Sequence, residues 1–216
     1  MPASPSTRTA NTGLSYELVV DAAAEIAQSG GFEALSMRSL ARRLGVGAMT
    51  LYGYVRTKEE LLGALADRIL GQMELPLADD GQGWRERIAG ICRAVRRAFL
   101  EHPELLPIVA QQRIDGPSAY RGAEAVLGAL REAGLSDREA VSTFGVLTSF
   151  TLGCAMREAG LRTTGGDSLP GLWQLPPEDF TNVIGLAGLM MTRDPEQEFE
   201  TGLDLLLTGI EGVIRR

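Results

Sequence analysis

The side chains with the clearest chemistry in this sequence are a cluster of cations near the N-terminus. No acidic residue lies between Glu33 and Glu59, and five basic residues fall in that interval: Arg38, Arg42, Arg43, Arg56 and Lys58. Lysine and arginine bind the phosphates of nucleic acids, and the planar guanidinium of arginine can also bind the edge of a guanine base. The interval therefore predicts contact with DNA.

The remainder of the chain has the opposite charge. The formal net charge is -7, and from Leu61 to the C-terminus 15 basic residues stand against 22 acidic ones. An acidic surface repels a phosphate backbone, so this distribution confines the predicted contact to the short basic interval.

Short helices must position these cations. Ser15 can cap a helix that ends at Gly30 and Gly31, and Ser36 can cap a second one that ends at Gly45. After the turn Gly45-Val46-Gly47 a third helix is predicted over residues 48–54. Two short helices joined by a glycine turn make a helix-turn-helix. Thr57 and Glu60 form a T-x-x-E capping box that opens a fourth helix, which runs to about Gln72.

Beyond these helices the pattern stays helical. Leu75 to Gly83 is rich in proline, aspartate and glycine and is typical of a linker, whereas Gly160 to Pro177 is predicted to be a long loop. No segment alternates as a strand does, so the fold class is all-α. We expect a disordered arm at 1–14, a DNA-binding domain with its connecting helix at 15–74, and a helical bundle at 75–216. The expected helices of the bundle span 84–100, 103–112, 117–133, 137–159, 177–191 and 195–214.

Other classes of function find little support. The two cysteines, Cys92 and Cys154, and the single histidine, His102, have no partners at metal-ligand spacing, so neither a metal nor a cofactor is expected. No glycine-rich phosphate loop or catalytic motif argues for an enzyme. No unbroken apolar stretch of about 18 residues or secretory signal occurs, which predicts a cytoplasmic protein with no membrane partner.

Residues 15–62 resemble the DNA-binding domain of the TetR family. The resemblance is carried by ALSMRSLARRLGVG at 34–47 and TLYGYVRTKEELL at 50–62. It implies that the third helix enters the major groove of DNA. Thr50 suits a base edge, and two tyrosines with Lys58 suit phosphates, whereas Gly53 replaces the bulky residue common in the family. The predicted DNA-binding residues are Arg38, Ala48, Met49, Thr50, Tyr52, Gly53, Tyr54 and Lys58.

The C-terminal half resembles the ligand-binding and dimerisation domain of the tetracycline-repressor branch, through residues 150–154 and 199–211. In that register the drug and magnesium ligands of the branch fall on Glu74, Ile91, Val109 and Ser149. Aliphatic side chains cannot coordinate a metal, so we expect an effector other than tetracycline-magnesium. A hydrophobic or amphipathic molecule would suit an apolar cavity with a few polar anchors. The predicted effector residues are Glu74, Ile91, Val95, Val109, Arg113, Val126, Phe144 and Ser149.

The last helix has an apolar face too wide for a monomer to cover. That face includes Phe199, Leu203, Leu207 and Ile210, and pairing it with the helix around Phe144 and Phe150 across a two-fold axis would give a four-helix bundle. The sequence thus predicts a homodimeric, ligand-responsive regulator of a palindromic operator, with repression implied by the family. The alternative is a helical ligand-binding or carrier protein without DNA function.

Overall fold

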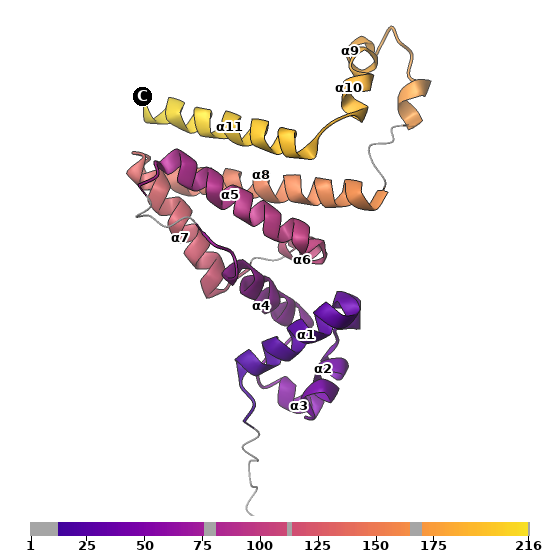
Figure 1. Cartoon of the computed structure of the whole chain (residues 1–216), viewed down its shortest axis with the longest axis vertical. Helices are drawn as coiled ribbons and strands as arrows, with labels where there is room; N and C mark the ends of the chain where they lie inside the picture. Colours follow the sequence, from indigo (N-terminus) through magenta and orange to yellow (C-terminus); the bar gives the residue numbers. More distant parts are fainter. Residues whose placement is uncertain (1–12, 76–80, 112–113, 165–169, 216) are drawn as a thin grey trace, which may run out of the picture. The chain divides into compact units, whose positions relative to one another are not determined.

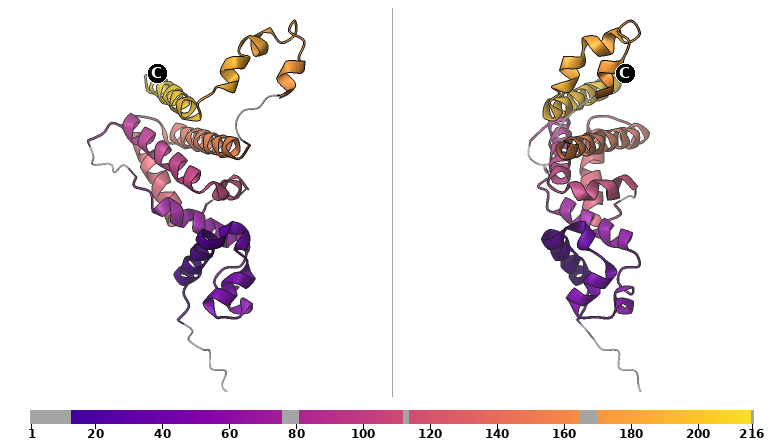
Figure 2. Two further views of the ribbon diagram at one scale, coloured as in Figure 1. Left: turned by 45° about the vertical axis from the view of Figure 1, so that its right-hand side comes forward. Right: turned by 90° about the vertical axis from the view of Figure 1, so that its right-hand side faces the viewer.

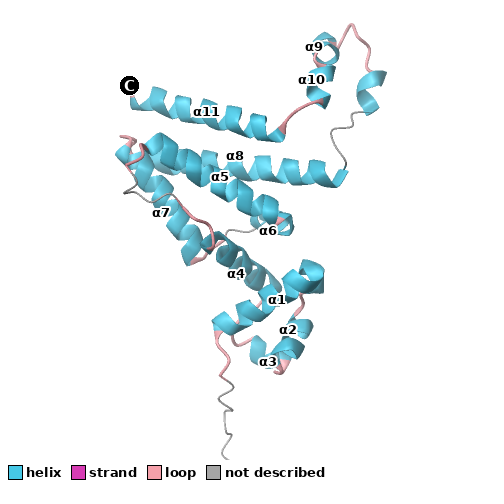
Figure 3. Ribbon diagram, in the orientation of Figure 1, coloured by secondary structure: helices cyan, strands magenta, loops and turns pink. Residues whose placement is uncertain are grey.

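The computed structural model describes residues 13–75, 81–111, 114–164 and 170–215. Within these ranges every regular element is a helix (Figures 1 and 3), which confirms the all-α prediction. Contacts divide the chain into two compact units, Met1–Ala66 and Asp67–Arg216. This division falls inside a helix, earlier than the predicted boundary after residue 74, because one continuous helix supplies side chains to both units. The predicted arm lies almost entirely outside the described residues.

The first unit is built from three helices and the beginning of a fourth: α1 (Tyr16–Ala34), α2 (Met37–Leu44), α3 (Ala48–Leu51) and α4 (Lys58–Gly71). Ser15 caps α1 by accepting from the Leu18 N–H at 3.2 Å. Ser36 and Ser39 cap α2 reciprocally. Gly45 ends α2 in the left-handed conformation at φ 65°, where a side chain would be strained. The two predicted serine caps are confirmed.

A small core holds these helices together. Its members come from every helix of the unit, and packing against one another removes their side chains from water. Because α2 and α3 are short, they are held by this burial and not by their own helical stability. The fully buried residues are Val19, Ala23, Leu35, Leu40, Leu51, Val55 and Leu61.

Two local predictions for this unit were wrong in detail. α3 ends at Leu51 instead of Tyr54, because the N–H groups of Gly53 and Tyr54 donate to carbonyls three residues back, which winds the chain into tighter turns. Glu60 donates its N–H to Thr57 Oγ1 as predicted, but its carboxylate accepts from the N–H of Arg56 at 2.8 Å and does not close the predicted capping box. A bend at Arg56 and Thr57 presents the Arg56 N–H to that carboxylate.

The second unit contains the longest helices of the chain. The predicted span of α11 is confirmed, whereas α8 runs through Thr164 and so takes up the start of the predicted loop. The predicted helix 177–191 is broken at Leu186, which has non-helical angles (φ -105°, ψ 4°). Its elements are α5 (Trp84–Glu101), η1 (Pro103–Leu105), α6 (Leu106–Gln111), α7 (Pro117–Glu132), α8 (Asp137–Thr164), η2 (Pro170–Gln174), α9 (Thr181–Gly185), α10 (Ala187–Met191) and α11 (Pro195–Ile214).

A buried cation ties three helices of this unit together. The Arg96 guanidinium on α5 pairs with Glu158 of α8 at 2.5 Å and with Glu196 of α11 at 2.6 Å. It also lies 4.8 Å from the centre of the Phe199 ring, which stacks on Phe150 with 5.5 Å between centroids. Since a buried charge is tolerated only when it is paired, these contacts fix how α5, α8 and α11 approach one another.

α8 also passes the length and hydropathy criteria for a membrane span over Asp137–Thr163, the one such helix among the described residues. Only 22% of its most apolar window is buried. Its polar residues Arg157 and Glu158 form ion pairs with α11 and α5, so one face of α8 packs against protein. The rest of α8 exposes apolar side chains, which a further surface would have to cover.

The close approach of α8 and α11 depends on Gly202. A Cβ at this position would lie 2.6 Å from two atoms of the Phe150 ring, so we expect Gly202→Ala to lower the free energy of unfolding by about 1–3 kcal/mol through overpacking. Gly128→Ala is the matched control, because a Cβ on Gly128 in α7 meets nothing within 4 Å. It should gain up to about 1 kcal/mol of helix propensity. Denaturant titration at one fixed protein concentration measures both, and equal effects would contradict this packing account.

Candidate nucleic-acid surface and ligand cavity

An exposed basic surface covers α2, α3 and the start of α4 in the first unit. Met49 has 83% of its surface exposed and Tyr52 has 46%. Among the described residues no ion pair engages the side chains of Arg38, Arg42 or Lys58. The remaining predicted contacts on this surface, Ala48, Thr50 and Gly53, are exposed as well.

Two other residues of this unit, the cation Arg43 and the predicted DNA contact Tyr54, already have partners within the protein. The Arg43 guanidinium forms an ion pair with Glu25 on α1. Tyr54 is half-buried against the core and its hydroxyl donates to the Leu14 carbonyl at 2.9 Å. A phosphate oxygen needs a donor, and in this structure the one hydroxyl proton of Tyr54 goes to Leu14, so the predicted contact with phosphate would have to replace this bond. In this structure Tyr54 fastens the chain that precedes α1.

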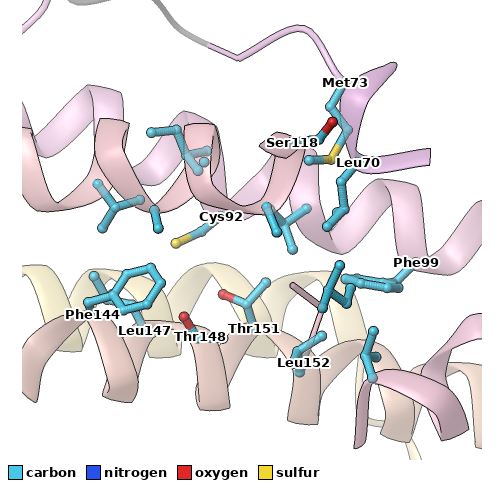
Figure 4. Close-up of a pocket in the computed structure, with 18 of the residues that line it drawn as sticks. Leu70, Met73, Cys92, Phe99, Ser118, Phe144, Leu147, Thr148, Thr151 and Leu152 are labelled. Atoms are coloured by element: carbon cyan, nitrogen blue, oxygen red, sulfur yellow. The ribbon is translucent and has the colours of Figure 1, made fainter. Parts of the chain in front are cut away.

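The second unit contains a cavity of about 450 Å³ between α4, α5, α6, α7 and α8 (Figure 4). Five predicted effector residues line it: Ile91, Val95, Val109, Val126 and Phe144. Glu74 and Ser149 do not, because both are exposed outside the lining, and Arg113 lies outside the described residues. The structure thus does not bring these two predicted polar anchors into the lining of the cavity.

Helix geometry explains the error at Ser149. Residues 144, 147, 148 and 151 follow the spacing of one helical face, and all four line the cavity, whereas position 149 lies about 100° around the helix from 148. Thr148 and Thr151 were missed, although extending the face of Phe144 by this spacing would have found them. In Figure 4 their hydroxyls face Cys92, which extends from α5.

The cavity is uncharged. No charged side chain occurs among its described lining residues, and its polar groups are hydroxyls and one thiol, on Cys92, Ser118, Tyr120, Thr148 and Thr151. Burial raises the pKa of the Cys92 thiol, while Thr151 and Arg93 act in the opposite direction, so the thiol stays neutral at physiological pH.

Thr151 is the most unusual of these polar groups. It is 2% exposed, and its hydroxyl has no hydrogen-bond partner of ordinary length among the described residues, the Cys92 thiol being its polar neighbour. A buried hydroxyl without a partner carries the cost of its lost hydration. A ligand group that reached it would recover that cost.

A helix-turn-helix that presents unpaired cations, joined to a helical unit with an apolar cavity, defines a ligand-responsive DNA-binding regulator. The model of the bacterial regulatory proteins of the tetR family matches residues 19–65, and that of the tetracyclin repressor-like C-terminal domain matches residues 75–214. The chain belongs to the TetR family and is a DNA-binding transcriptional regulator. The alternative of a carrier without DNA function is not favoured.

Similar proteins include both repressors and solved structures. The transcriptional repressor DrrR1 of Streptomyces coeruleorubidus is 34% identical, with 93% of this chain and 78% of that protein covered. The class D tetracycline repressor of Escherichia coli is 32% identical, with 92% and 89% covered. The structure of ActR from Streptomyces coelicolor in complex with actinorhodin is 31% identical, covers 94% of this chain and 99% of that one, and has a TM-score of 0.82.

The two tyrosines of the first unit should respond differently to loss of their hydroxyls. Tyr54→Phe removes the bond to Leu14 and is expected to lower the free energy of unfolding by about 1 kcal/mol. Tyr52→Phe is the control, because that ring is exposed and its hydroxyl has no recorded partner, so it should change stability little. Thermal unfolding followed by circular dichroism distinguishes them. A larger loss for Tyr52→Phe would contradict the assignment of Tyr54 as the structural residue.

Proposed function

We propose that this regulator is a cytoplasmic homodimer that represses genes from a palindromic operator and is released by a neutral, largely apolar small molecule. The observation that carries the effector part is the uncharged cavity of about 450 Å³, which has the size and lining of a small-molecule site. Ile91 and Val109 contribute only hydrocarbon to it, which supports an effector other than tetracycline-magnesium. The structure of ActR in complex with actinorhodin offers a precedent for a small-molecule ligand in a related chain.

The polar groups of the cavity narrow the class of effector. Thr148 and the buried hydroxyl of Thr151 lie on one wall, so a ligand with a hydroxyl or carbonyl on an otherwise apolar frame would complement it. A charged group would enter an environment without a counter-ion, which is costly. We therefore propose a neutral, oxygenated, largely apolar compound.

Exposed apolar side chains support the dimer. α8 and α11 lie side by side (Figures 1 and 2), and they leave large apolar residues uncovered. A second copy of the same two helices would cover them in a four-helix bundle, and its two-fold axis would match a palindrome. The exposed residues are Val141 at 63%, Val146 at 51%, Met156 at 41%, Leu205 at 68% and Val213 at 38%.

A titration of labelled DNA tests this function. The fragments are the DNA flanking the gene and sequences selected from a random library, with excess nonspecific competitor at fixed salt. The expected result is a salt-sensitive, competitor-resistant complex of two protomers per palindrome. Folded protein that selects no DNA sequence, or that binds as one protomer, would overturn the corresponding part of the proposal.

Arg38 and Lys58 provide the first variant test. Both are exposed, and neither forms a recorded ion pair, so Arg38→Gln with Lys58→Gln should abolish specific binding at physiological salt. If both side chains contact phosphate, the variant loses two contacts in each protomer, so in the complex of two protomers the slope of log affinity against log salt should fall by about 4. The matched control is Arg131→Gln with Arg215→Gln, which removes two exposed cations of the second unit. Equal loss in both pairs would mean that only net charge matters.

Gly122 permits the cavity to be filled without disturbing its walls. It lines the cavity on α7, and a Cβ there meets nothing within 4 Å, so Gly122→Phe should occupy ligand space. We expect the affinity for any compound that releases the wild-type protein from DNA to fall about tenfold or more, equivalent to 1.4 kcal/mol. Gly128→Phe is the control, since Gly128 is also open but outside the cavity lining. Unchanged release by the effector in Gly122→Phe would place the effector elsewhere.

A further inference from the structure

Asp67 on α4 caps a helix to which it does not belong. Its carboxylate is buried, with 9% of the residue exposed, and it accepts from the backbone N–H groups of Ala119 at 2.8 Å and Ser118 at 3.3 Å. These are free amides of the first turn of α7. The N-cap of α7 itself is Gly116, which has no side chain to do this. The first turn of α7 is thus satisfied from α4.

The two helices approach so closely that glycines are required at the contact. A Cβ on Gly116 would lie 2.1 Å from the Asp67 carboxyl carbon and 2.4 and 2.5 Å from its oxygens. On α4, a Cβ on Gly71 would lie 2.7 Å from Ser118 Oγ. Because the two backbones come this close at Gly116 and Gly71, the start of α7 cannot move against α4 without straining these hydrogen bonds.

The same residues form part of the cavity wall. Ser118 and Ala119 line the cavity, and so do Leu70 on α4 and Met73 just beyond it. The other end of α4 belongs to the first unit, where Leu61 and Leu65 are buried in its core. Asp67 therefore lies on the one helix that is shared by the cavity wall and the DNA-binding core.

We infer that Asp67 is a positioning residue that couples occupation of the cavity to the placement of α4. This inference rests on the proposed function. A ligand that displaces the first turn of α7 carries Asp67 with it, because separation would leave a buried carboxylate and two amides without partners. α4 then moves as a rigid helix and biases the equilibrium between the DNA-bound and released states. No contact of Asp67 with the ligand or with DNA is needed.

Linkage makes this inference testable without an identified effector. If occupation of the cavity alters affinity for DNA, then DNA must alter the start of α7 by the same coupling free energy. The probe is the operator fragment selected above, and the readout is amide hydrogen exchange of Ser118 and Ala119 with and without it. Pro117 has no amide proton, and the Tyr120 amide donates to the Gly116 carbonyl at 3.1 Å, so amide-resolved exchange is needed to follow Ser118 and Ala119 separately within residues 116–120.

The decisive variant is Asp67→Asn. The amide has one acceptor oxygen in place of two, so it satisfies only one of the two N–H groups. In the wild type, operator binding should change exchange at Ser118 and Ala119 by about fivefold or more, and in Asp67→Asn the ratio with and without operator should approach one. Asp137→Asn, which removes an exposed carboxylate at 84% side-chain exposure, should keep the wild-type ratio.

If Asp67 only stabilised the first turn of α7, the result would differ. Exchange in Asp67→Asn would then rise by the same factor with and without DNA. The ratio of the two rates would stay as in the wild type, which would overturn the inference. If operator binds the wild type but leaves exchange at Ser118 and Ala119 unchanged, the inference is overturned while the proposed function stands. If the wild type binds no operator at all, the inference and the proposed function both fail. If Asp67→Asn fails to fold, Gly116→Ala breaks the same contact from α7 and should abolish the ratio in the same way.

Discussion

The arrangement of this protein depends on α4, a single helix that serves two cores. Leu61 and Leu65 are buried with α1, α2 and α3, whereas Leu70 lines the cavity of the second unit. The helix between them has no proline and no non-helical residue at which it could bend freely. Within the second unit, the buried carboxylate of Asp67 adds a polar constraint to the apolar contacts of α4.

Local signals in the sequence were sufficient for most of the fold. Serine caps at Ser15 and Ser36, the glycine at Gly45, and apolar spacing at three and four residues gave the helices of the first unit and the span of α11. The failures occurred where two local signals compete. At Gly53 a helical pattern meets a residue of weak helix propensity, and the chain tightens into turns. The predicted helix at 177–191 is broken at Leu186 for a similar reason, because Gly185 and Gly188 lie beside it.

The sites were harder to predict, because they depend on contacts between distant segments. Aliphatic lining residues such as Ile91 and Val126 followed from helical faces and the family register, but the polar anchors did not. Ser149 has suitable chemistry but lies on another face of α8, and Glu74 lies beyond the end of α4, whereas Thr151 is on the lining face and went unnoticed. Asp67 gave no signal at all, since its role requires the start of α7, some 50 residues away in the chain, to lie beside it. The bond from Tyr54 was not foreseen for the same reason, as its partner Leu14 precedes the helix-turn-helix pattern.

The distribution of charge limits how an effector can act. The cations that face DNA are confined to the first unit, and the cavity has no charged group among its described lining residues. A neutral ligand in an uncharged cavity does not alter the electrostatic potential at a phosphate backbone, and salt screens such effects beyond about 8–10 Å in any case. Under the proposed function, release therefore arises from geometry, through a ligand that fits one arrangement of α4 and α7 better than the other. In this mechanism the strength of the response depends on how firmly those two helices are joined. The hydrogen bonds from the Ser118 and Ala119 amides to Asp67 are directional, so they resist sliding of α7 along α4.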